Sequence, residues 1–412
     1  MKPEPGPSPT TKSDRRLPRA VFWLGVVSLA TDASSEMIYP LLPLFLVSVL
    51  GAGQEFVGAI EGAAEALASL LKLVSGRLAD RARRKKPLTI FGYGISSTVR
   101  PLVGLATAPW MVLAIRLTDR VGKGLRSSPR DALIADATPA DRRGRAFGFH
   151  RAMDNTGAMI GPAIATALLV WGHLTLRTIF LLAIVPGVVA MIALVGGVRE
   201  RAREPSPPPS PGAAPDPAAL LRAHPRTNER ALAPYLAALT LFALGNASDA
   251  FLLLRAQALG VAAGLIPALW LLHNAVKAAL STKGGALSDR LGRRRLILCG
   301  WVVYGLTYLG FGLAHSAWQI WILFCVYGIY YSLVEGTEKA LVVDLVGPSF
   351  RGRAFGFYYA VVGLAALPAS LGFGWLADHY GALVPFSVSA ALALSAAVLL
   401  WWRVPEPARP TE

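Results

Sequence analysis

Two carboxyl groups lie in an otherwise apolar stretch near the start of the sequence. Asp32 and Glu36 are four residues apart, so a helix would place both on one face, one turn before Tyr39. Burial and a like-charged neighbour both favour the protonated form of a carboxyl group, which suits it to binding and releasing protons. We therefore expect at least one of the two to exchange protons. The alternative is that Asp32 caps a helix or pairs with a buried arginine.

Other polar side chains also fall within apolar stretches, where they are costly unless they face a cavity or a partner. We expect a cavity lined by Asp32, Glu36, Tyr39, Glu61, Glu65, Arg116, Asp154, Asn246, Asp249, His273, Asn274, Lys277 and Glu335. Glu61, Glu65 and Lys72 fall on one helical stripe, although Glu61 is nearer one end and open to hydration. Asp154 has an alternative role as a partner of Arg151 or of a basic loop residue.

The elements that must position these residues are helices. Of the 412 residues, 54% are hydrophobic and 16% charged, whereas a typical soluble domain has about a quarter charged. Backbone groups in hydrocarbon must be satisfied within their own segment, and a span needs roughly 20 residues, so we expect twelve transmembrane helices. The apolar blocks are Val21–Leu50, Val57–Leu73, Leu88–Ala108, Trp110–Thr118, Ala146–Val170, Leu174–Val198, Leu232–Leu254, Val261–Leu280, Leu296–Ala314, Trp318–Val334, Ala354–Ala377 and Ala382–Trp402.

The net charge of +16 comes from basic residues in alternate loops. Lys and Arg cluster in 81–86, 142–145, 199–230 and 290–295, while the intervening loops have few or none. The positive-inside rule then places both termini and the middle of the chain in the cytoplasm. This pattern is not the basic face of a nucleic-acid-binding module, and we expect no nucleic-acid partner.

The sequence repeats itself about half a chain apart. The seven-residue segment RGRAFGF at Arg143–Phe149 recurs unchanged at Arg351–Phe357. The segment GRLADR at Gly76–Arg81 is matched by GALSDR at Gly285–Arg290. A Pro-rich segment between the copies cannot be helical. We expect an N-terminal tail (1–19), a six-helix bundle (20–198), a linker (199–230), a second six-helix bundle (231–403) and a C-terminal tail (404–412).

Twelve spans, a central linker and the repeated Gly-x-Leu-x-Asp-Arg loop resemble the major facilitator superfamily over essentially the whole chain after the N-terminal tail. The resemblance implies an all-α membrane fold of two pseudo-symmetric bundles that rock about a central site. It also implies a location in the bacterial inner (cytoplasmic) membrane. The nearest-looking members are permeases labelled for drug or metal resistance.

The repeated loop resembles the family's cytoplasmic clasp, which stabilises the outward-facing state. Glycine allows close helix approach, while aspartate can cap a helix and pair with arginine. We assign to the clasp Gly76, Asp80, Arg81, Arg84, Gly285, Asp289 and Arg290. We also expect gate pairs between the two halves, rather than substrate contacts, from Arg130, Asp131, Glu338 and Lys339.

Two more stretches are similar to family motifs. Gly148, Gly157, Gly161 and Pro162 follow the spacing of the antiporter motif, which accompanies exporters; the alternative is ordinary close packing. Arg116 is similar to the arginine that is linked to proton transfer in proton-coupled members. The alternative is a structural ion pair between Arg116 and Asp119, three residues on.

These features predict a proton-coupled antiporter that exports a small polar, charged or amphiphilic molecule by alternating access. The proton gradient, with no cofactor, would supply the energy. The alternative is a transporter of a metal ion or metal chelate, with ligands from Asp32, Glu36, Glu61, Glu65 and His273. We expect no enzyme, because no P-loop or nucleophile constellation occurs. The expected partners are the substrate, protons and the bilayer, with a monomer as the working unit.

Overall fold

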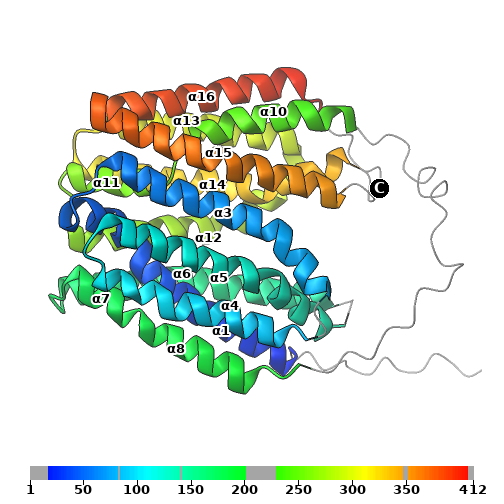
Figure 1. The fold of residues 1–412 in the computed structure, drawn as a ribbon. Helices are drawn as coiled ribbons and strands as arrows, with labels where there is room; N and C mark the ends of the chain where they lie inside the picture. Colours follow the sequence, from blue (N-terminus) through cyan, green and yellow to red (C-terminus); the bar gives the residue numbers. More distant parts are fainter. Residues whose placement is uncertain (1–16, 82–83, 140–141, 201–228, 347–350, 407–412) are drawn as a thin grey trace, which may run out of the picture.

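The computed structural model describes residues 17–81, 84–139, 142–200, 229–346 and 351–406, without the side chains of 72–81, 229–231, 282, 286, 289 and 351–353. Within these ranges the chain is helical and contains no strand (Figure 1). The N-terminal half contains α1 (Arg19–Ile38), η1 (Tyr39–Leu41), α2 (Leu42–Leu44), η2 (Phe45–Val49), α3 (Gln54–Arg81), α4 (Lys86–Val99), η3 (Arg100–Leu105), α5 (Pro109–Asp136), α6 (Arg143–Val170), α7 (Leu176–Leu182), α8 (Ile184–Ile192) and η5 (Ala193–Gly197). The C-terminal half contains α10 (Glu229–Gly245), α11 (Ala250–Ala258), η6 (Ala263–Leu265), α12 (Ile266–Leu291), α13 (Arg293–Leu313), α14 (Ala317–Leu345), α15 (Arg351–Tyr380) and α16 (Leu383–Arg403).

Every expected apolar block contains a helix or a chain of helices. Eight of these, within the described residues, are long and apolar enough to cross a membrane. The other four blocks form α3, α4, α5 and α6, which are more polar or, like α4, shorter. The count of twelve spans and the side on which the termini lie stay predictions.

The two ends of the helix bundle differ in the segments that lie there. At one end η5 stops and α10 begins; we call it the linker end (Figure 1). At the other, which we call the loop end, tight turns at Gly51, Gly260 and Gly381 have φ of 68°, 88° and 76°. Glycine adopts this left-handed conformation without the steric cost that other residues meet.

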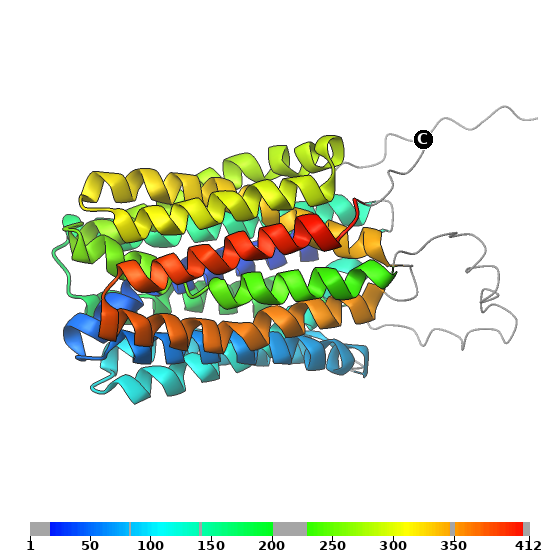
Figure 2. The same cartoon turned by 90° about the horizontal axis from the view of Figure 1, so that it is seen from above.

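The two halves meet along two helix pairs, α3 with α15 and α6 with α12 (Figures 1 and 2). The first pair is held close by glycine. A Cβ atom on Gly58 would lie 2.1 Å from the carbonyl oxygen of Ser370, and one on Gly363 would lie 2.2 Å from the Cβ of Ser69. Neither contact is possible, so side chains at these positions would force the two halves apart.

A carboxylate of one half caps a helix of the other at the loop end. Asp378 of α15 accepts hydrogen bonds from the backbone N–H groups of Gln54 (3.1 Å) and Glu55 (2.9 Å), at the start of α3. The amide of Gln257 also donates to the hydroxyl of Ser48 at 3.3 Å. A helix N-terminus favours negative charge, so Asp378 stabilises this closed arrangement.

We expect Asp378→Asn to loosen the loop end, because each carboxylate oxygen of Asp378 accepts one backbone N–H and an amide has only one acceptor oxygen. A cap contributes about 1 kcal/mol, which is roughly fivefold in the equilibrium between closed and open loop ends. The measurement is the labelling rate of Phe251→Cys by an impermeant maleimide, with Cys299 and Cys325 replaced by serine. Phe251 lines a loop-end cavity of about 310 Å³ between the halves.

Glu55→Gln is the matched control for this experiment. It changes an exposed carboxylate beside the cap, but it keeps the backbone N–H that Asp378 accepts from. Equal labelling rates in Asp378→Asn and the unmodified protein would contradict a latch at the loop end.

Two of the long helical segments are interrupted on the way to the loop end. After α1, Pro40 and Pro43 lie in short 3-10 and α-helical turns that lead into a π-helical turn. Between α10 and α11, residues 246–249 leave the helix altogether. Proline removes backbone donors and breaks a helix, and non-helical backbone at membrane depth occurs where it lines a cavity.

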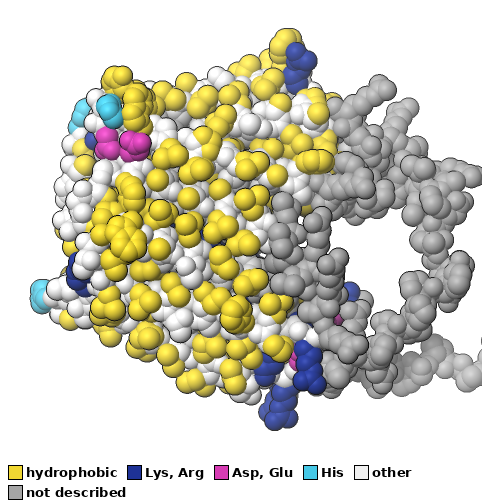
Figure 3. All heavy atoms as spheres, in the orientation of Figure 1, with side chains coloured by type: hydrophobic (Ala, Val, Ile, Leu, Met, Phe, Trp, Pro, Cys, Tyr) yellow, Lys and Arg dark blue, Asp and Glu magenta, His cyan; other side chains and the backbone are white. Residues whose placement is uncertain are grey.

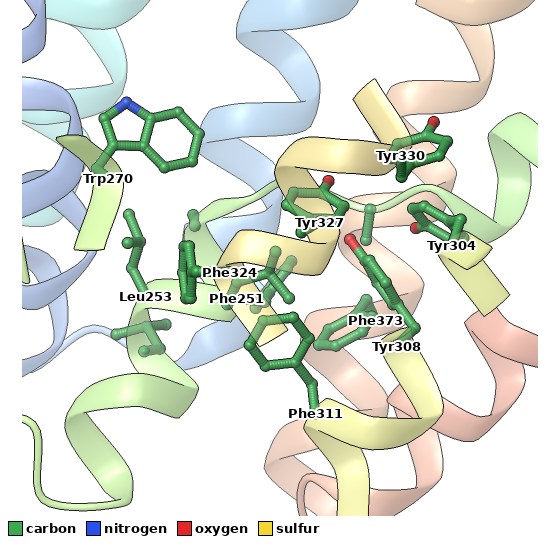
Figure 4. Packing of buried hydrophobic residues seen from close by; sticks show 14 of the residues in the cluster. Phe251, Leu253, Trp270, Tyr304, Tyr308, Phe311, Phe324, Tyr327, Tyr330 and Phe373 are labelled. Atoms are coloured by element: carbon green, nitrogen blue, oxygen red, sulfur yellow. The ribbon is translucent and has the colours of Figure 1, made fainter. Parts of the chain in front are cut away.

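Aromatic rings fill much of the C-terminal half. Tyr304 and Tyr308 stack at 4.1 Å between centroids, and Tyr327 and Tyr330 stack at 5.7 Å beside them (Figure 4). On the outside, hydrophobic side chains cover most of the face shown in Figure 3, and the coloured charged groups lie toward its ends. An apolar belt with charged ends is the surface expected of a protein that spans a bilayer.

Candidate functional site

The carboxylate of Glu36 joins the two halves of the molecule. Glu36 lies on α1 and accepts a 2.7 Å hydrogen bond from the indole Nε1 of Trp270, which belongs to α12. The ring of Tyr39 packs on the same indole, with centroids 5.2 Å apart. An ionised carboxylate accepts a stronger hydrogen bond than a neutral one. The strength of this link between the halves therefore depends on whether Glu36 is protonated.

The glycines of α6 bring that helix against the carboxylate-bearing face of α1. A Cβ on Gly157 would lie 2.4 Å from the carbonyl oxygen of Leu29 and 3.0 Å from the Cβ of Asp32. A Cβ on Gly161 would lie 2.9 Å from the Cβ of Glu36. The glycines of the motif thus bring the backbone of α6 into direct contact with that of α1 beside Asp32 and Glu36.

Three further details concern the rest of the motif and the neighbouring Asp32. Nothing lies within 4 Å of a Cβ built on Gly148, so this glycine does not serve close packing. Pro162 is buried within α6. Asp32 is half-buried and forms no ion pair with any described residue, so the alternative pairing with a buried arginine is absent there.

A buried ion pair crosses from α3 to α5. The guanidinium of Arg116 binds the carboxylate of Glu61 with N–O distances of 2.7, 2.8 and 3.1 Å, and both residues are 7% exposed. Asp119 binds Arg100 instead, at 2.8 Å. The alternative of an Arg116–Asp119 pair is therefore wrong, and so is the alternative of a hydrated Glu61. Each arginine reaches a carboxylate on a neighbouring helix, which satisfies two ion pairs rather than one.

Asp154 binds neither of its expected partners among the described residues. Its carboxylate accepts a hydrogen bond from the hydroxyl of Ser28 on α1, and the Nδ1 of His150 lies 3.5 Å from it. His150 is buried rather than hydrated. Arg151 binds Glu335 of the C-terminal half instead, so the alternative of an Asp154–Arg151 pair is wrong.

Glu335 of α14 is the meeting point of three cations. Arg151 of α6 and Lys277 of α12 each lie 2.8 Å from its carboxylate, and Lys339 lies 3.8 Å away. The amide of Asn274 donates to the carbonyl oxygen of Ala158 at 3.4 Å, also between α12 and α6. Glu335 therefore provides the ion-pair contact between the halves that the sequence predicted for other residues.

The predicted gate pairs do not form as expected. Arg130 binds its neighbour Asp131 at 2.8 Å, within α5. Glu338 is buried in the C-terminal half and accepts hydrogen bonds from Trp301 (3.0 Å) and Tyr358 (2.8 Å). Among the described residues, Arg130, Asp131 and Glu338 form no ion pair between the halves, so this part of the prediction is wrong, because the buried Glu338 finds neutral donors on the adjacent helices.

Much of the expected clasp lies outside the described residues. This holds for the surroundings of Gly76 and for the side chains of Asp80, Arg81 and Asp289, as well as for the side chain of Lys72. Arg84, Gly285 and Arg290 are exposed at the linker end.

Two acidic residues that the sequence did not single out bind the basic loops at this end. Glu200 accepts the N–H groups of Lys85 (2.7 Å) and Lys86 (3.1 Å). Glu406 accepts the N–H of Arg294 at 3.2 Å.

A cavity of about 300 Å³ lies between the halves. Its expected residues are Tyr39, Glu61, Glu65, Asn246 and Asp249, the last two from the break between α10 and α11. The lining residues that the sequence analysis did not predict are Arg120, Ala243, Ala247, Ser248, Tyr331, Val362, Ala366 and Ser370. The other expected residues do not line it: Asp32, Glu36, Arg116, Asp154, His273, Asn274, Lys277 and Glu335.

Asp249 is held in the cavity wall by tyrosine. Its carboxylate accepts hydrogen bonds from the hydroxyl groups of Tyr327 (2.5 Å) and Tyr331 (3.4 Å). Both rings come from α14, so this helix fixes the position of the carboxylate in the α10–α11 break. A buried carboxylate needs such donors when it has no cation beside it.

His273 lies among aromatic rings rather than among carboxylates. It stacks on Trp270 at 5.0 Å between centroids and packs against Tyr327 at 5.2 Å. Among the described residues, no three His, Cys, Asp or Glu side chains come close enough to hold a metal ion. The ligand set of the metal alternative is therefore not assembled in this conformation, since Glu61 is taken by Arg116.

Comparisons with known proteins give one consistent result. The family profile described as Major Facilitator Superfamily matches residues 24–273 and 250–412. A protein of Methanocaldococcus jannaschii named as an uncharacterised MFS-type transporter is 35% identical over 371 residues, covering 89% of this chain and 90% of the relative. The multidrug resistance protein MdtH of Edwardsiella ictaluri is 23% identical over 398 residues, covering 93% of each.

Solved structures share the fold at lower identity. A POT family transporter in complex with 5-aminolevulinic acid superposes with a TM-score of 0.75 at 13% identity, covering 93% of this chain and 96% of that one. The nucleoside transporter NupG superposes with a TM-score of 0.71 at 12% identity, covering 93% and 98%.

Proposed function

The chain belongs to the major facilitator superfamily of transporters and is a multi-pass membrane protein, and from this premise we propose that it exports a small polar, charged or amphiphilic molecule in exchange for protons. The transport cycle is alternating access between the two halves. We place the protein in the bacterial inner membrane as a monomer, with both termini in the cytoplasm. The proton gradient supplies the energy, without a cofactor.

The hydrogen bond between Glu36 and Trp270 is the observation that carries this proposal. It is a contact between an intramembrane carboxylate of one half and a donor of the other. Protonation of Glu36 weakens the contact, so protonation and the relative position of the halves are energetically linked. Such a link is what proton-coupled alternating access requires, because the proton must favour one arrangement over the other.

The cavity supports a transport role because both halves contribute to it. Tyr39 and Glu65 come from the N-terminal half, whereas Asp249 and Ser370 come from the C-terminal half. At the loop end, Asp378 of one half caps a helix of the other half. A ligand in the cavity would then exchange with one side at a time as the latch opens and closes.

The direction of transport rests on two weaker observations. The α6 glycine motif, similar to that of antiporters, packs directly behind the carboxyl groups of α1. A relative that covers 93% of this chain is named for multidrug resistance. Both favour export.

The test is a susceptibility panel of drugs, dyes and metals in an efflux-deficient bacterium, followed by proton measurement with whichever compound responds. Expression should raise resistance to at least one compound. Adding that compound to energised inverted vesicles should then release protons from the lumen. Expression without any gain in resistance, or added sensitivity, would overturn export. Transport without proton release would overturn proton coupling.

A further inference from the structure

The central cavity is lined by one arginine that forms no ion pair within 4 Å with a described residue. Arg120 of α5 lines the cavity, and its Nε is buried without a hydrogen-bond partner among the described residues. Two other arginines of this half each bind a carboxylate: Arg116 binds Glu61 and Arg100 binds Asp119. A buried guanidinium nitrogen without an acceptor is costly, and an anion from a ligand would remove that cost.

Two carboxylates of the same cavity form no ion pair within 4 Å with a described residue. Glu65 of α3 is an exposed side chain in the lining, and Asp249 accepts hydrogen bonds from two tyrosine hydroxyl groups. Glu61 also lines the cavity, but Arg116 neutralises it. The charges that are left to act on a ligand are therefore one cation and two carboxylates.

The rest of the lining determines the body of the ligand. The side chains of Ala243, Ala247, Val362 and Ala366 are small and apolar. The rings of Tyr39 and Tyr331 add aromatic surface, and Asn246, Ser248 and Ser370 add uncharged polar groups. A volume of about 300 Å³ is at the small end of ligand sites. The cavity therefore fits a compact molecule with an aliphatic or aromatic body and charged ends.

We propose that the central cavity binds a zwitterion in which a carboxylate and an ammonium group flank a short apolar body. Arg120 binds the carboxylate, and Glu65 and Asp249 bind the ammonium group. The ammonium group thereby joins α3 of one half to the α10–α11 break of the other. This inference rests on the proposed transport function and gives its substrate class.

The test compares matched ligands that differ in one charge. The purified protein in detergent is titrated with leucine, phenylalanine and alanyl-phenylalanine, with their C-terminal amides and with their N-acetyl forms, and binding is measured by thermal stabilisation. At least one free zwitterion should bind roughly 10- to 100-fold more tightly than its amide and its N-acetyl form, because each modification removes a charge-assisted contact.

Two variants assign the two ends of the ligand. Arg120→Gln should remove the preference for the zwitterion over the amide and keep the preference over the N-acetyl form. Glu65→Gln should remove the preference for the zwitterion over the N-acetyl form and keep the preference over the amide. Arg403→Gln, on an exposed arginine of α16 that stacks on Trp402, is the charge-matched control and should change neither.

The proposal is overturned if no zwitterion of the panel binds, if amides or N-acetyl forms bind as well as the zwitterions, or if both variants weaken all three forms equally. Binding in detergent requires no proton gradient. Zwitterion binding without proton release from vesicles would therefore overturn the proposed coupling alone. Proton-coupled export of compounds that are not zwitterions would overturn the substrate class alone.

Discussion

Arg116→Gln is expected to lower the free energy of unfolding by about 3–5 kcal/mol, because it leaves the carboxylate of Glu61 buried without its cation. Both members of this pair are 7% exposed, and three N–O contacts of 3.1 Å or less join them. Neither Asp119 nor Arg100 can compensate, since they bind each other. The measurement is thermal unfolding of the purified protein in detergent, and the variant should unfold at a clearly lower temperature.

The double variant Glu61→Gln/Arg116→Gln separates a lost ion pair from a lost side-chain volume. Two amides can hydrogen-bond to each other and leave no buried charge, so most of the stability should return. Glu55→Gln, at an exposed position on the same helix, should have an effect within about 0.5 kcal/mol. A double variant as unstable as Arg116→Gln would mean that the site needs the arginine for packing rather than for charge.

Helix positions could be predicted because hydrocarbon imposes one rule on every backbone. Each expected apolar block does contain a helix. The helices α5 and α14 extend well beyond their blocks, to Asp136 and Leu345. These extensions carry charged residues, which a search for apolar stretches leaves out although a helix readily accommodates them.

Partners of the buried charges could not be predicted from spacing along the chain. Asp119 is three residues from Arg116, yet its partner Arg100 is on the preceding helix segment. In the same way Arg151 binds Glu335 of the other half rather than Asp154. Sequence spacing gives the face of one helix, whereas the partner depends on which neighbouring helix that face meets.

Arg120 was missed for a different reason. In the sequence it stands out only as a departure from a family motif, in the position of a glycine. Its role as a cavity residue depends on the rotation of α5 and on Arg116 having taken Glu61. The signal that could have found it is the excess of cations on α5 over the carboxylates available to pair with them.

Glu36→Gln is expected to abolish proton-driven accumulation of the exported compound. The amide cannot release a proton, but its oxygen can still accept the indole N–H of Trp270. The contact between the halves is therefore kept while its dependence on protonation is lost. Exchange of labelled for unlabelled compound across the membrane, which moves no net protons, should persist. The measurement is both fluxes in proteoliposomes, with and without an imposed pH gradient.

Trp270→Phe tests the same link from the other half. It keeps a carboxyl group that can titrate but removes the donor, and a hydrogen bond to a charged acceptor contributes about 1.5–3 kcal/mol. Proton movement should then continue while the equilibrium between the two arrangements shifts by roughly 10- to 100-fold. The shift should be seen as an altered labelling rate of Phe251→Cys.

If Glu36→Gln still accumulates the compound against its gradient, the coupling carboxylate is elsewhere. Asp32 is then the next position to test, because it is the other carboxyl group held against the α6 glycines.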